Sequence, residues 1–413
     1  MQTACVSLVV RALTAADIQA ALALLSMTFG EVPHPDDRAC DLDVVDPSRF
    51  YGAEVCGELV GTAGSFALTL TVPGGPAPVA GVTWVGVSPV HRRQGVLHAL
   101  MRRQLDDLHA RGEAVAALWA SEGGIYPRFG YAPAAWDLRV TLPHGAPFLT
   151  PVPRHAPGQV GLRLAAPDQR VLAPLYDAVL DRRPGWFARD DAWWRYRLHD
   201  PEHARPGATP LQAAVADVDA SGGGGGYVLY RQRSAWTDGI PTGSVEVVEL
   251  VAGDAAVRAR LWRHVLDLDL TAEVTARCVP TDDPLLQLLA EPRRARARTS
   301  ENLWVRLVDV PAALALRRYA CDVDVVVQVA DPVCPWNEGT FRLTGGRDGA
   351  TCTRIDSPAE LALSSNDLAA AYLGGTPLSA RAATVRELVP GALSRTSTAF
   401  GPLDGSPCCP MVF

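Results

Sequence analysis

The hydrophobic and polar positions of the first 120 residues alternate between helical and strand periods. Apolar residues recur at helical spacing over residues 14–29, after Thr14, which can cap a helix. Two strand-like runs follow, Phe50–Val55 and Leu59–Thr71, and the short turn between them predicts a hairpin. The pattern then predicts a turn-rich loop at 72–78, a strand at Val79–Val87, a polar turn at Ser88–Gly95, a helix over roughly Val96–Ala110 and a strand at Ala114–Ala120. This order of elements predicts an α/β domain with a central sheet.

The middle of the chain repeats this mixture, and the last part differs from it. A proline-rich linker is predicted around Thr150–Pro157, and a second boundary at the basic stretch Pro292–Arg298. Between them the pattern predicts helices at 168–181 and Ala256–Leu266, and strands at Gly226–Tyr230, Ser244–Leu250 and Thr271–Val279. The α+β tail has predicted strands at Leu303–Leu307, Val323–Val329 and Gly339–Leu343, and predicted helices at Pro311–Tyr319, Pro358–Leu363 and Ser365–Tyr372. We therefore predict three domains, at residues 1–150, 151–297 and 298–413.

The composition is that of an ordinary soluble globular protein, with 48% hydrophobic and 20% charged residues among 413. No stretch reaches the ~20 consecutive apolar residues of a membrane helix, and the N-terminal residues lack the features of a signal peptide. The net charge of −7 argues against nucleic acid as a partner. Nine cysteines without a CxxC pair favour a reduced, cytoplasmic protein.

The segment VTWVGVSPVHRRQGVLHALM, residues 82–101, carries the most informative chemistry. Its predicted strand ends at Val87 and its helix begins after Gly95, with Arg92 and Arg93 between them. A glycine lets the backbone approach a phosphate closely, and the exposed amides and dipole of a helix start attract an anion. A solvated basic turn is the common alternative. The apolar strand before the turn, and a second site signal about 30 residues later, favour a pyrophosphate site.

These residues carry a resemblance to a known family. VGVSPVHRRQGVLHAL resembles the acyl-CoA-binding motif of the GNAT superfamily of N-acetyltransferases, with Arg92-x-x-Gly95-x-Leu97 at the pyrophosphate loop. Leu97 departs from the Gly or Ala of most members. That departure, the motif SEGGIYPRFGY and the length resemble the enhanced intracellular survival (Eis) family. In the tail, WVRLVDVPAALALRRYA is similar to that family's sterol-carrier-like domain.

The resemblance implies an architecture and an activity. It implies tandem GNAT acetyltransferase folds, of which only the first is catalytic, followed by a C-terminal α+β sterol-carrier-like domain. It also implies a hexamer that uses acetyl-CoA to acetylate aminoglycosides and other polyamines at several amines. By resemblance, Val85 and Val87 bind the pantetheine arm, and the Val85 N–H is a candidate to polarise the thioester carbonyl. The remaining residues expected to bind acetyl-CoA are Arg92, Arg93, Gly95, Val96 and Ser121.

Tyr126, within SEGGIYPRFGY, is the predicted general acid. A tyrosine pKa near 10 is reasonably matched to a thiolate leaving group, whose conjugate thiol has a pKa of roughly 8.5 to 10. A half-buried core tyrosine is the structural alternative, and the motif favours the acid.

The general base is harder to find, because Trp84, Val85 and Val87 on the predicted active strand do not ionise. The resemblance suggests the free α-carboxylate of the last residue, Phe413. An exposed α-carboxyl with a pKa near 3.5 is a poor base, but burial in an apolar pocket raises it. A frayed tail is the alternative, although the apolar ending after Pro410 is less typical of fraying.

Candidate contacts to the acceptor follow the first predicted helix. Phe29 and Glu31 lie where the superfamily's acceptor cleft opens, and Glu31 suits a cationic amine while Trp84 suits an aromatic wall. Asp36 and Asp37 are better interpreted as surface charges. His91 and His98 have no carboxylate partner at ligand spacing, so we predict no metal site.

We therefore predict an N-acetyltransferase that moves acetyl from acetyl-CoA to primary amines of cationic small molecules by direct attack in a ternary complex. No RxxG loop follows a comparable turn in the central domain, so no second CoA site is expected. Two alternatives stay open: a protein-lysine acetyltransferase, and a non-enzymatic carrier of an apolar ligand in the C-terminal domain.

Overall fold

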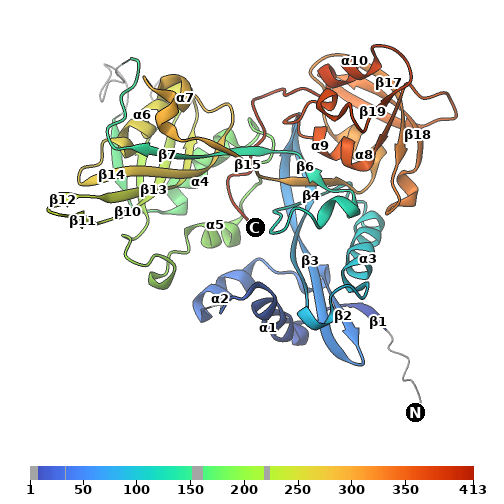
Figure 1. The fold of residues 1–413 in the computed structure, drawn as a ribbon, viewed down its shortest axis with the longest axis horizontal. Coiled ribbons are helices and arrows are strands. Elements are labelled where there is room, and N and C mark those ends of the chain that lie inside the picture. Colours follow the sequence, from blue (N-terminus) through green and yellow to red (C-terminus); the bar gives the residue numbers. More distant parts are fainter. Residues whose placement is uncertain (1–7, 33, 151–160, 218–223) are drawn as a thin grey trace. The chain divides into compact units, whose positions relative to one another are not determined.

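The chain forms two compact units in the computed structural model, which describes residues 8–32, 34–150, 161–217 and 224–413 (Figure 1). The first unit contains residues 1–135, 303–403 and 412–413, and the second contains 136–302 and 404–411. Residues 151–157 of the predicted linker lie outside the described residues. The predicted domain boundaries at 150 and 297 stay predictions.

A seven-stranded sheet forms the N-terminal part of the first unit, in the order β1-β2-β3-β4-β5-β16-β6. Its strands are β1 (Leu8–Ala12), β2 (Phe50–Val55), β3 (Glu58–Val72), β4 (Gly75–Val87), β5 (Val115–Leu118), β6 (Ala132–Pro133) and β16 (Trp304–Leu307). Neighbouring strands are antiparallel except β4 and β5. The long hairpin of β3 and β4 is the centre of the sheet.

Two helices cover opposite faces of this hairpin. Helix α3 (Val96–Ala110) packs its Val96 and Leu100 into one cluster with the side chains of β2 and β3. Helix α1 (Ile18–Phe29) lies on the other face, where a Cβ on Gly86 would stand 3.1 Å from Leu25 Cδ2. The connections contain the 3-10 turns η1 (Ala15–Asp17), η2 (Pro47–Arg49), η3 (Pro89–His91) and η4 (Tyr126–Phe129), and helix α2 (Pro35–Asp43).

The C-terminal part of the first unit is an α+β domain around a five-stranded sheet of order β19-β18-β17-β20-β21. Its strands are β17 (Val323–Ala330), β18 (Gly339–Gly346), β19 (Gly349–Arg354), β20 (Leu361–Ser364) and β21 (Arg386–Glu387). Its helices are α8 (Val310–Leu316), α9 (Ser365–Ala371) and α10 (Ala392–Ala399), with the 3-10 turns η7 (Pro335–Asn337) and η8 (Leu378–Arg381).

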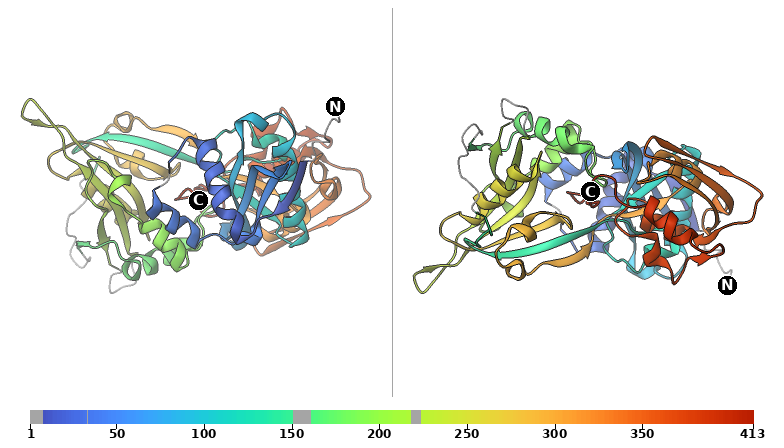
Figure 2. Two further views of the ribbon diagram at one scale, coloured as in Figure 1. Left: turned by 90° about the horizontal axis from the view of Figure 1, so that it is seen from below. Right: turned by 90° about the horizontal axis from the view of Figure 1, so that it is seen from above.

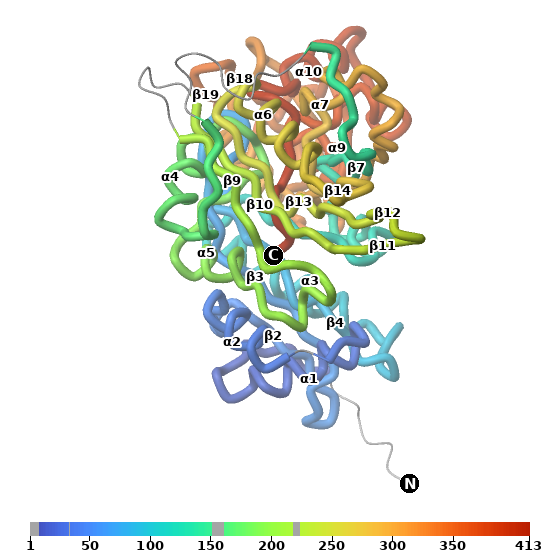
Figure 3. The backbone as a smooth tube through the Cα atoms, turned by 90° about the vertical axis from the view of Figure 1, so that its left-hand side faces the viewer, coloured from blue at the N-terminus to red at the C-terminus, as the bar shows by residue number. Residues whose placement is uncertain are grey.

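The second unit is built on another seven-stranded sheet, of order β15-β7-β14-β13-β10-β9-β8 (Figure 3). Its strands are β7 (Trp136–Pro143), β8 (Leu162–Ala165), β9 (Gln212–Ala216), β10 (Gly226–Arg233), β13 (Gly243–Ala252), β14 (Thr271–Pro280) and β15 (Arg298–Glu301). Its helices are α4 (Gln169–Leu180), α5 (Asp191–Leu198), α6 (Ala255–Leu266) and α7 (Leu285–Leu288), with the turns η5 (Glu202–Ala204) and η6 (Pro292–Ala295). A short hairpin of β11 (Trp236–Thr237) and β12 (Ile240–Pro241) projects from this sheet (Figure 2).

The two large sheets have the same plan and exchange a strand. Each has a parallel pair joined through a helix, β4-α3-β5 in the first and β13-α6-β14 in the second. In the first sheet, the strand beside β5 is β16, which follows β15 of the second sheet along the chain. In the second sheet, the strand beside β14 is β7, which follows β6 of the first. Each half of the chain therefore completes the sheet of the other.

Two sequence predictions about local structure are wrong. Residues Pro358–Leu363 are not a helix, because Leu361–Ser364 pair in parallel with β17. The predicted loop at 72–78 is mostly strand, since Val72 pairs with Gly75 across a tight turn. Pro76 and Pro78 are tolerated there because β5 pairs only with residues 80–82, which leaves one edge of β4 open at the prolines. No helix among the described residues is long and apolar enough to cross a membrane.

A buried ion pair fixes β16 to the C-terminal domain. Arg306 on β16 and Asp331 after β17 are both fully buried, with Arg306 Nη2 2.6 Å from Asp331 Oδ2. Asp331 also accepts from the Cys334 N–H and from Asn337 Nδ2. Its carboxylate therefore organises the segment that follows β17.

We expect Asp331→Asn to destabilise the protein by about 3–5 kcal/mol, because it leaves the Arg306 charge buried without a counter-ion. The free energy of unfolding in urea measures the effect. Asp324→Asn is the matched control, since the Asp324–Arg342 pair is more than half exposed on both sides, at 57% and 53%. Equal unfolding midpoints for the two variants would contradict the assignment.

Candidate active site

Strand β4 separates from β5 halfway along its length. The parallel register joins Ala80 to Ala116, Gly81 to Ala117 and Val82 to Leu118, and ends there. Strand β4 continues to Val87, and no described strand pairs with this edge of it beyond Val82. The backbone groups on that edge are therefore available to a ligand.

A bulge in β4 lies at the point of separation. Between the pairs Gly64–Thr83 and Thr62–Gly86, two residues of β4, Trp84 and Val85, stand opposite one residue of β3. Trp84 has φ +53°, a left-handed conformation that is strained for a large side chain. The buried Thr62 hydroxyl donates to the Trp84 carbonyl at 2.8 Å and stabilises this conformation.

The bulge determines which backbone groups face the open edge. The Ser88 N–H donates to the Val60 carbonyl of β3 at 2.8 Å, so the backbone groups of Ser88 face β3. Because these groups alternate along a strand, those of Val87, and of Val85 two residues earlier, face away from β3. The structure thus places the two predicted pantetheine-binding residues with their amides at the open edge.

The turn from β4 to α3 forms a concave row of backbone amides. Arg93 (φ +62°) and Gly95 (φ +82°) are both left-handed, an alternation that makes an anion-binding nest. Gly95 is the N-cap of α3 and has no side chain to cap the first-turn amides, so Val96 begins a helix whose amides are open. Arg92 and Arg93 are exposed and make no ion pair with a described residue. This set of donors fits a pyrophosphate.

The corresponding turn of the second unit is closed. Only Gly253 and Asp254 separate β13 from α6, and the Asp254 carboxylate caps the helix by accepting from the Val257 N–H at 2.8 Å. The same carboxylate accepts from the Gly224 N–H at 3.1 Å. A carboxylate is therefore already present at this helix start, and the lack of a second CoA site in this fold stays a prediction.

Tyr126 begins η4 and lies in the hydrophobic cluster that α3 forms with β4 and β5. The side chain is 5% exposed and packs edge-on against Tyr131, with ring centroids 6.0 Å apart. Val85 and Leu97 border the same cluster. Burial, with a smaller contribution from the Glu122 charge, raises the pKa of Tyr126 to about 12. Its hydroxyl has no hydrogen-bond partner among the described residues and is protonated at neutral pH.

The C-terminal domain holds the turn that carries Tyr126. Asn366 Nδ2, at the start of α9, donates to the carbonyls of Pro127 and Tyr131, both at 2.9 Å. The Arg306 guanidinium lies against Gly130, where an added Cβ would come within 2.7 Å of it. These contacts hold η4 at Pro127 and at the two residues that follow it, Gly130 and Tyr131.

Phe413 lies on the opposite face of β4 from Tyr126. Its ring edge, Cε2, is 3.1 Å from the position a Cβ on Gly81 would occupy, and Leu68 of β3 fills the other side of that position. Gly81 alternates with Ala80 and Val82, whose side chains join the cluster of Tyr126. The chain terminus and the phenol are therefore separated by the strand whose edge is open.

Aromatic side chains line the Phe413 face of the hairpin. The Phe50 ring contacts Trp84 at 4.8 Å and Phe66 at 6.2 Å between centroids, in edge-on geometry. Phe66 and Leu68 are two residues apart on β3, so their side chains share one face of the strand, the face on which Phe413 lies. Trp84 thus lies on the Phe413 face of the hairpin, and its contact with an acceptor stays a prediction.

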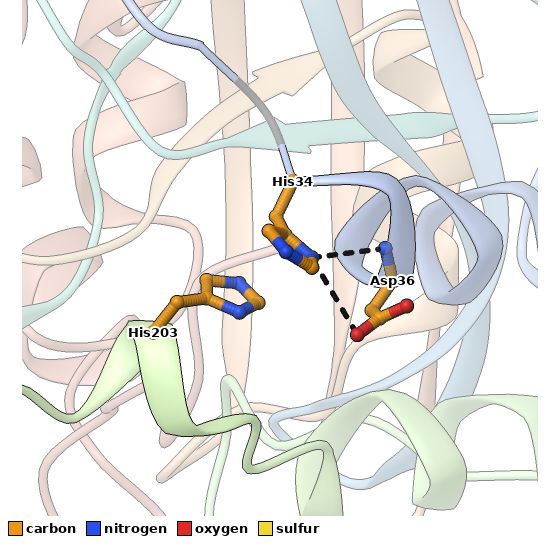
Figure 4. A group of neighbouring side chains, drawn as sticks. All are labelled: His34, Asp36 and His203. Atoms are coloured by element: carbon orange, nitrogen blue, oxygen red, sulfur yellow. Dashed lines mark hydrogen bonds and ion pairs between the residues drawn. The ribbon is translucent and has the colours of Figure 1, made fainter.

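Phe29 and Glu31 lie at the end of α1, on the same face. Phe29 is 46% exposed, and Glu31 is exposed and makes no ion pair with a described residue. Asp36 differs, because His34 Nδ1 caps the start of α2 by accepting from the Asp36 N–H at 3.3 Å and lies 3.5 Å from Asp36 Oδ2 (Figure 4). Glu31 is the better placed of these carboxylates for a free cation.

The remaining predicted residue, Ser121, is exposed just after β5. Sequence reasoning missed Thr62, the aromatic pair Phe50 and Phe66, and Asn366. None of these carries a local signal, because each acts through a partner distant in the chain.

We expect Thr62→Val to lower the turnover of acetyl-CoA about fivefold, because it removes a hydrogen bond of about 1 kcal/mol from the strained bulge. Thr62→Ser keeps the hydroxyl and is expected to retain the wild-type rate. Initial rates of thiol release measure both, with the Kd of acetyl-CoA as a check on binding. Equal rates for the Val and Ser variants would show that the bulge does not need this contact.

Comparisons with known proteins agree with this geometry. Residues 9–134 and 185–307 each match a family described as an acetyltransferase (GNAT) domain, and residues 310–410 match a sterol carrier protein domain. The crystal structure of Eis1 from Mycobacterium abscessus superposes with a TM-score of 0.83 and 31% identity, over 98% of this chain and 100% of that one. The predicted fold class, tandem GNAT folds followed by a carrier-like domain, is confirmed.

Relatives of known sequence define the activity class. An uncharacterized N-acetyltransferase of Streptomyces avermitilis is 46% identical over 346 residues, which are 83% of this chain and 84% of its own. N-acetyltransferase Eis of Mycobacterium tuberculosis is 35% identical over 347 residues, 81% of each chain. The predicted enzyme class is confirmed, and the GNAT fold implies acetyl-CoA as co-substrate. The chain belongs to the Eis family of GNAT N-acetyltransferases.

Proposed function

We propose that this enzyme transfers acetyl from acetyl-CoA to primary amines of cationic small molecules, aminoglycosides and polyamines among them, by direct attack in a ternary complex. The observation that supports it most is the open edge of β4, which begins at the Trp84 bulge and ends at the Arg92–Gly95 turn. An acyl-CoA placed along this edge meets strand amides at its arm and a nest at its pyrophosphate. Arg92, Arg93, Gly95, Val96 and Ser121 are the residues proposed to hold its polar end.

The two proton transfers are assigned to opposite faces of β4. The acceptor amine attacks the thioester carbonyl carbon, so a C–N bond forms and the C–S bond breaks. We assign the polarisation of the carbonyl to the Val85 N–H at the open edge. Tyr126, on the α3 face, gives its proton to the departing thiolate, and the Phe413 α-carboxylate, on the other face, takes a proton from the amine. Direct attack needs no acyl-enzyme.

The acceptor face favours a cation. Trp84, which is partly exposed, offers a π face to an ammonium group, and the exposed carboxylate of Glu31 adds a negative charge near the end of α1. Phe29 extends this surface. A small polyamine and a protein lysine share this chemistry, and a panel that contains both kinds of acceptor distinguishes them by kcat/KM.

The carrier alternative is disfavoured by the core of the C-terminal domain. Fully buried Arg317 donates to the carbonyls of Ala371, Tyr372 and Phe400, and its guanidinium lies over the Tyr319 and Phe400 rings at 4.6 and 4.5 Å. A polar, filled centre of this kind does not suit an apolar ligand. The hexamer implied by the family resemblance is also proposed, and light scattering of the full chain tests it.

We expect Tyr126→Phe, and a variant with one glycine added after Phe413, each to lower kcat by about 10²-fold or more, the usual size of a general acid or base effect. The first removes the proton donor. The second moves the only α-carboxylate by one residue, about 3.5 Å. Thiol release with the acceptor panel measures both, and Val412→Ala, at a 52% exposed position, is the matched control for a change in the tail.

Each assignment can fail separately. An extended variant with full activity removes the carboxylate from the mechanism, and a fully active Tyr126→Phe removes the phenol. If wild type neither binds nor turns over acetyl-CoA, the proposed reaction itself fails.

The raised pKa of Tyr126 predicts the alkaline side of the pH profile. The protonated phenol is the active form, so its ionisation lowers kcat only as the pH rises through its pKa, which is about 12. An unperturbed tyrosine would start this decline near pH 10. We therefore expect no decline of kcat from about pH 8 to pH 10 that is due to ionisation of Tyr126. A decline in that range that is absent from Tyr126→Phe would contradict the assignment.

A further inference from the structure

The last segment of the chain is built into the second unit. Residues 404–411 belong to this unit, and Cys408, Cys409 and Met411 are at most 5% exposed. The Cys408 N–H donates to the Pro184 carbonyl at 3.0 Å, and its backbone packs against Gly185, where an added Cβ would come within 3.0 Å. A terminus held in this way is an ordered element of the fold.

The segment lies at the opening between β13 and β14. Their parallel register ends at the pair Val247–Ala276, as that of β4 and β5 ends at Val82. Pro410 lines a small cavity there together with Val248 of β13 and Cys278 of β14. In the catalytic fold the corresponding opening is the proposed site of the acetyl-CoA arm.

This second opening is already filled by protein. The buried Arg189 and Glu249 form an ion pair at 2.7 Å, and Tyr227 donates its hydroxyl to Glu249 Oε2 at 2.6 Å. Trp186 lines the same cavity. The opening therefore holds an ion pair and the chain's own tail in place of a cofactor.

Asn302 is the polar clamp on this tail. Its Oδ1 accepts from the Cys409 N–H at 2.7 Å, and its Nδ2 donates to the Cys409 carbonyl at 3.1 Å. Nδ2 also donates to Asp137 Oδ2 at 3.2 Å, which fixes the amide, and the side chain is 1% exposed. Both backbone groups of one tail residue are thus held by one side chain.

A second anchor lies upstream and is nearer the surface. Asp282 Oδ2 accepts from the Ser406 N–H at 2.9 Å, and Arg183 donates to the Ser406 carbonyl at 2.6 Å. Arg183 and Asp282 pair with each other at 2.7 Å. The tail is therefore held by hydrogen bonds at Ser406 and at Cys409, three positions apart, before the chain reaches Phe413.

We propose that the second GNAT fold serves as the holder of the C-terminal tail, with Asn302 as the positioning residue for the Phe413 carboxylate. This inference rests on the proposed base role of that carboxylate. Three residues separate Cys409 from Phe413, and a slip of one residue moves the carboxylate by about 3.5 Å. Since misplacement by about 1 Å can cost a hundredfold in rate, the register at Cys409 sets the position of the base.

The test compares Asn302→Ala with Glu301→Ala, a matched control at the neighbouring exposed position. Carboxypeptidase digestion of the full chain, followed by intact mass, measures whether the terminus is held, independently of activity. We expect Asn302→Ala to release Phe413 at least tenfold faster than wild type. We also expect its kcat to fall by about ten- to a hundredfold with an unchanged Kd for acetyl-CoA. Glu301→Ala is expected to match wild type in both measurements.

A double-variant cycle separates positioning from general damage. Combined with the glycine added after Phe413, Asn302→Ala is expected to cause no further loss of kcat, because the base is already displaced. Asp282→Asn, at the partly exposed anchor, repeats the digestion test if Asn302→Ala does not fold. Unchanged release of Phe413, unchanged kcat, or losses that add in the double variant each overturn the proposal. If Asn302→Ala releases Phe413 faster than wild type while the variant with the added glycine keeps full activity, the clamp exists and the proposed base has failed.

Discussion

The structure depends on one unpaired strand edge. Backbone N–H and C=O groups are obligatory hydrogen-bonding groups, and a sheet that leaves them open inside a domain must supply another partner. Here β4 parts from β5 after Val82, and the bulge at Trp84 turns the strand so that Val85 and Val87 present their amides to the gap. In the proposed function the pantetheine arm, an extended chain with alternating acceptors, satisfies those groups. The position of each other element of the site follows from this edge.

The C-terminal domain supports the edge from one side. Its Asn366 donates to the carbonyls of Pro127 and Tyr131, which follow Tyr126, and its Asp331 neutralises Arg306, which is buried against the same turn. The Arg306–Asp331 pair is buried and the Asn366–Tyr131 hydrogen bond is partly buried, so both cost desolvation and bring directional order in return. In the proposed mechanism this turn carries the phenol that faces the leaving sulfur, and the contacts of the C-terminal domain hold the turn in place.

How much the sequence predicts depends on the range of each contact. The turn from Arg92 to Gly95 and the position of Tyr126 are local, because glycine, proline and helix-start signals act within a few residues. The exchange of β7 and β16 between sheets requires pairing between residues 130 or more positions apart, as in Glu273–Pro143, which periodicity does not encode. Periodicity does not predict the strand at Leu361–Ser364 either, because its conformation depends on parallel pairing with β17. No sequence motif marks Thr62 or Asn302, because each acts only on a backbone group that the fold brings next to it.

The duplicated fold offers a way to hold the carboxylate that we propose as the base. A terminal carboxylate is mobile unless its last residues are held, and an exposed one is too acidic to accept a proton from an ammonium. In the second fold the capping Asp254 closes the anion site, and the Arg189–Glu249 pair fills the opening between β13 and β14. An opening that excludes a cofactor can still bind an extended segment of chain. Strand backbone groups and the buried side-chain amide of Asn302 supply the hydrogen bonds. The tail occupies this opening, and the order gained over residues 404–411 reduces the freedom of Phe413 to that of two residues.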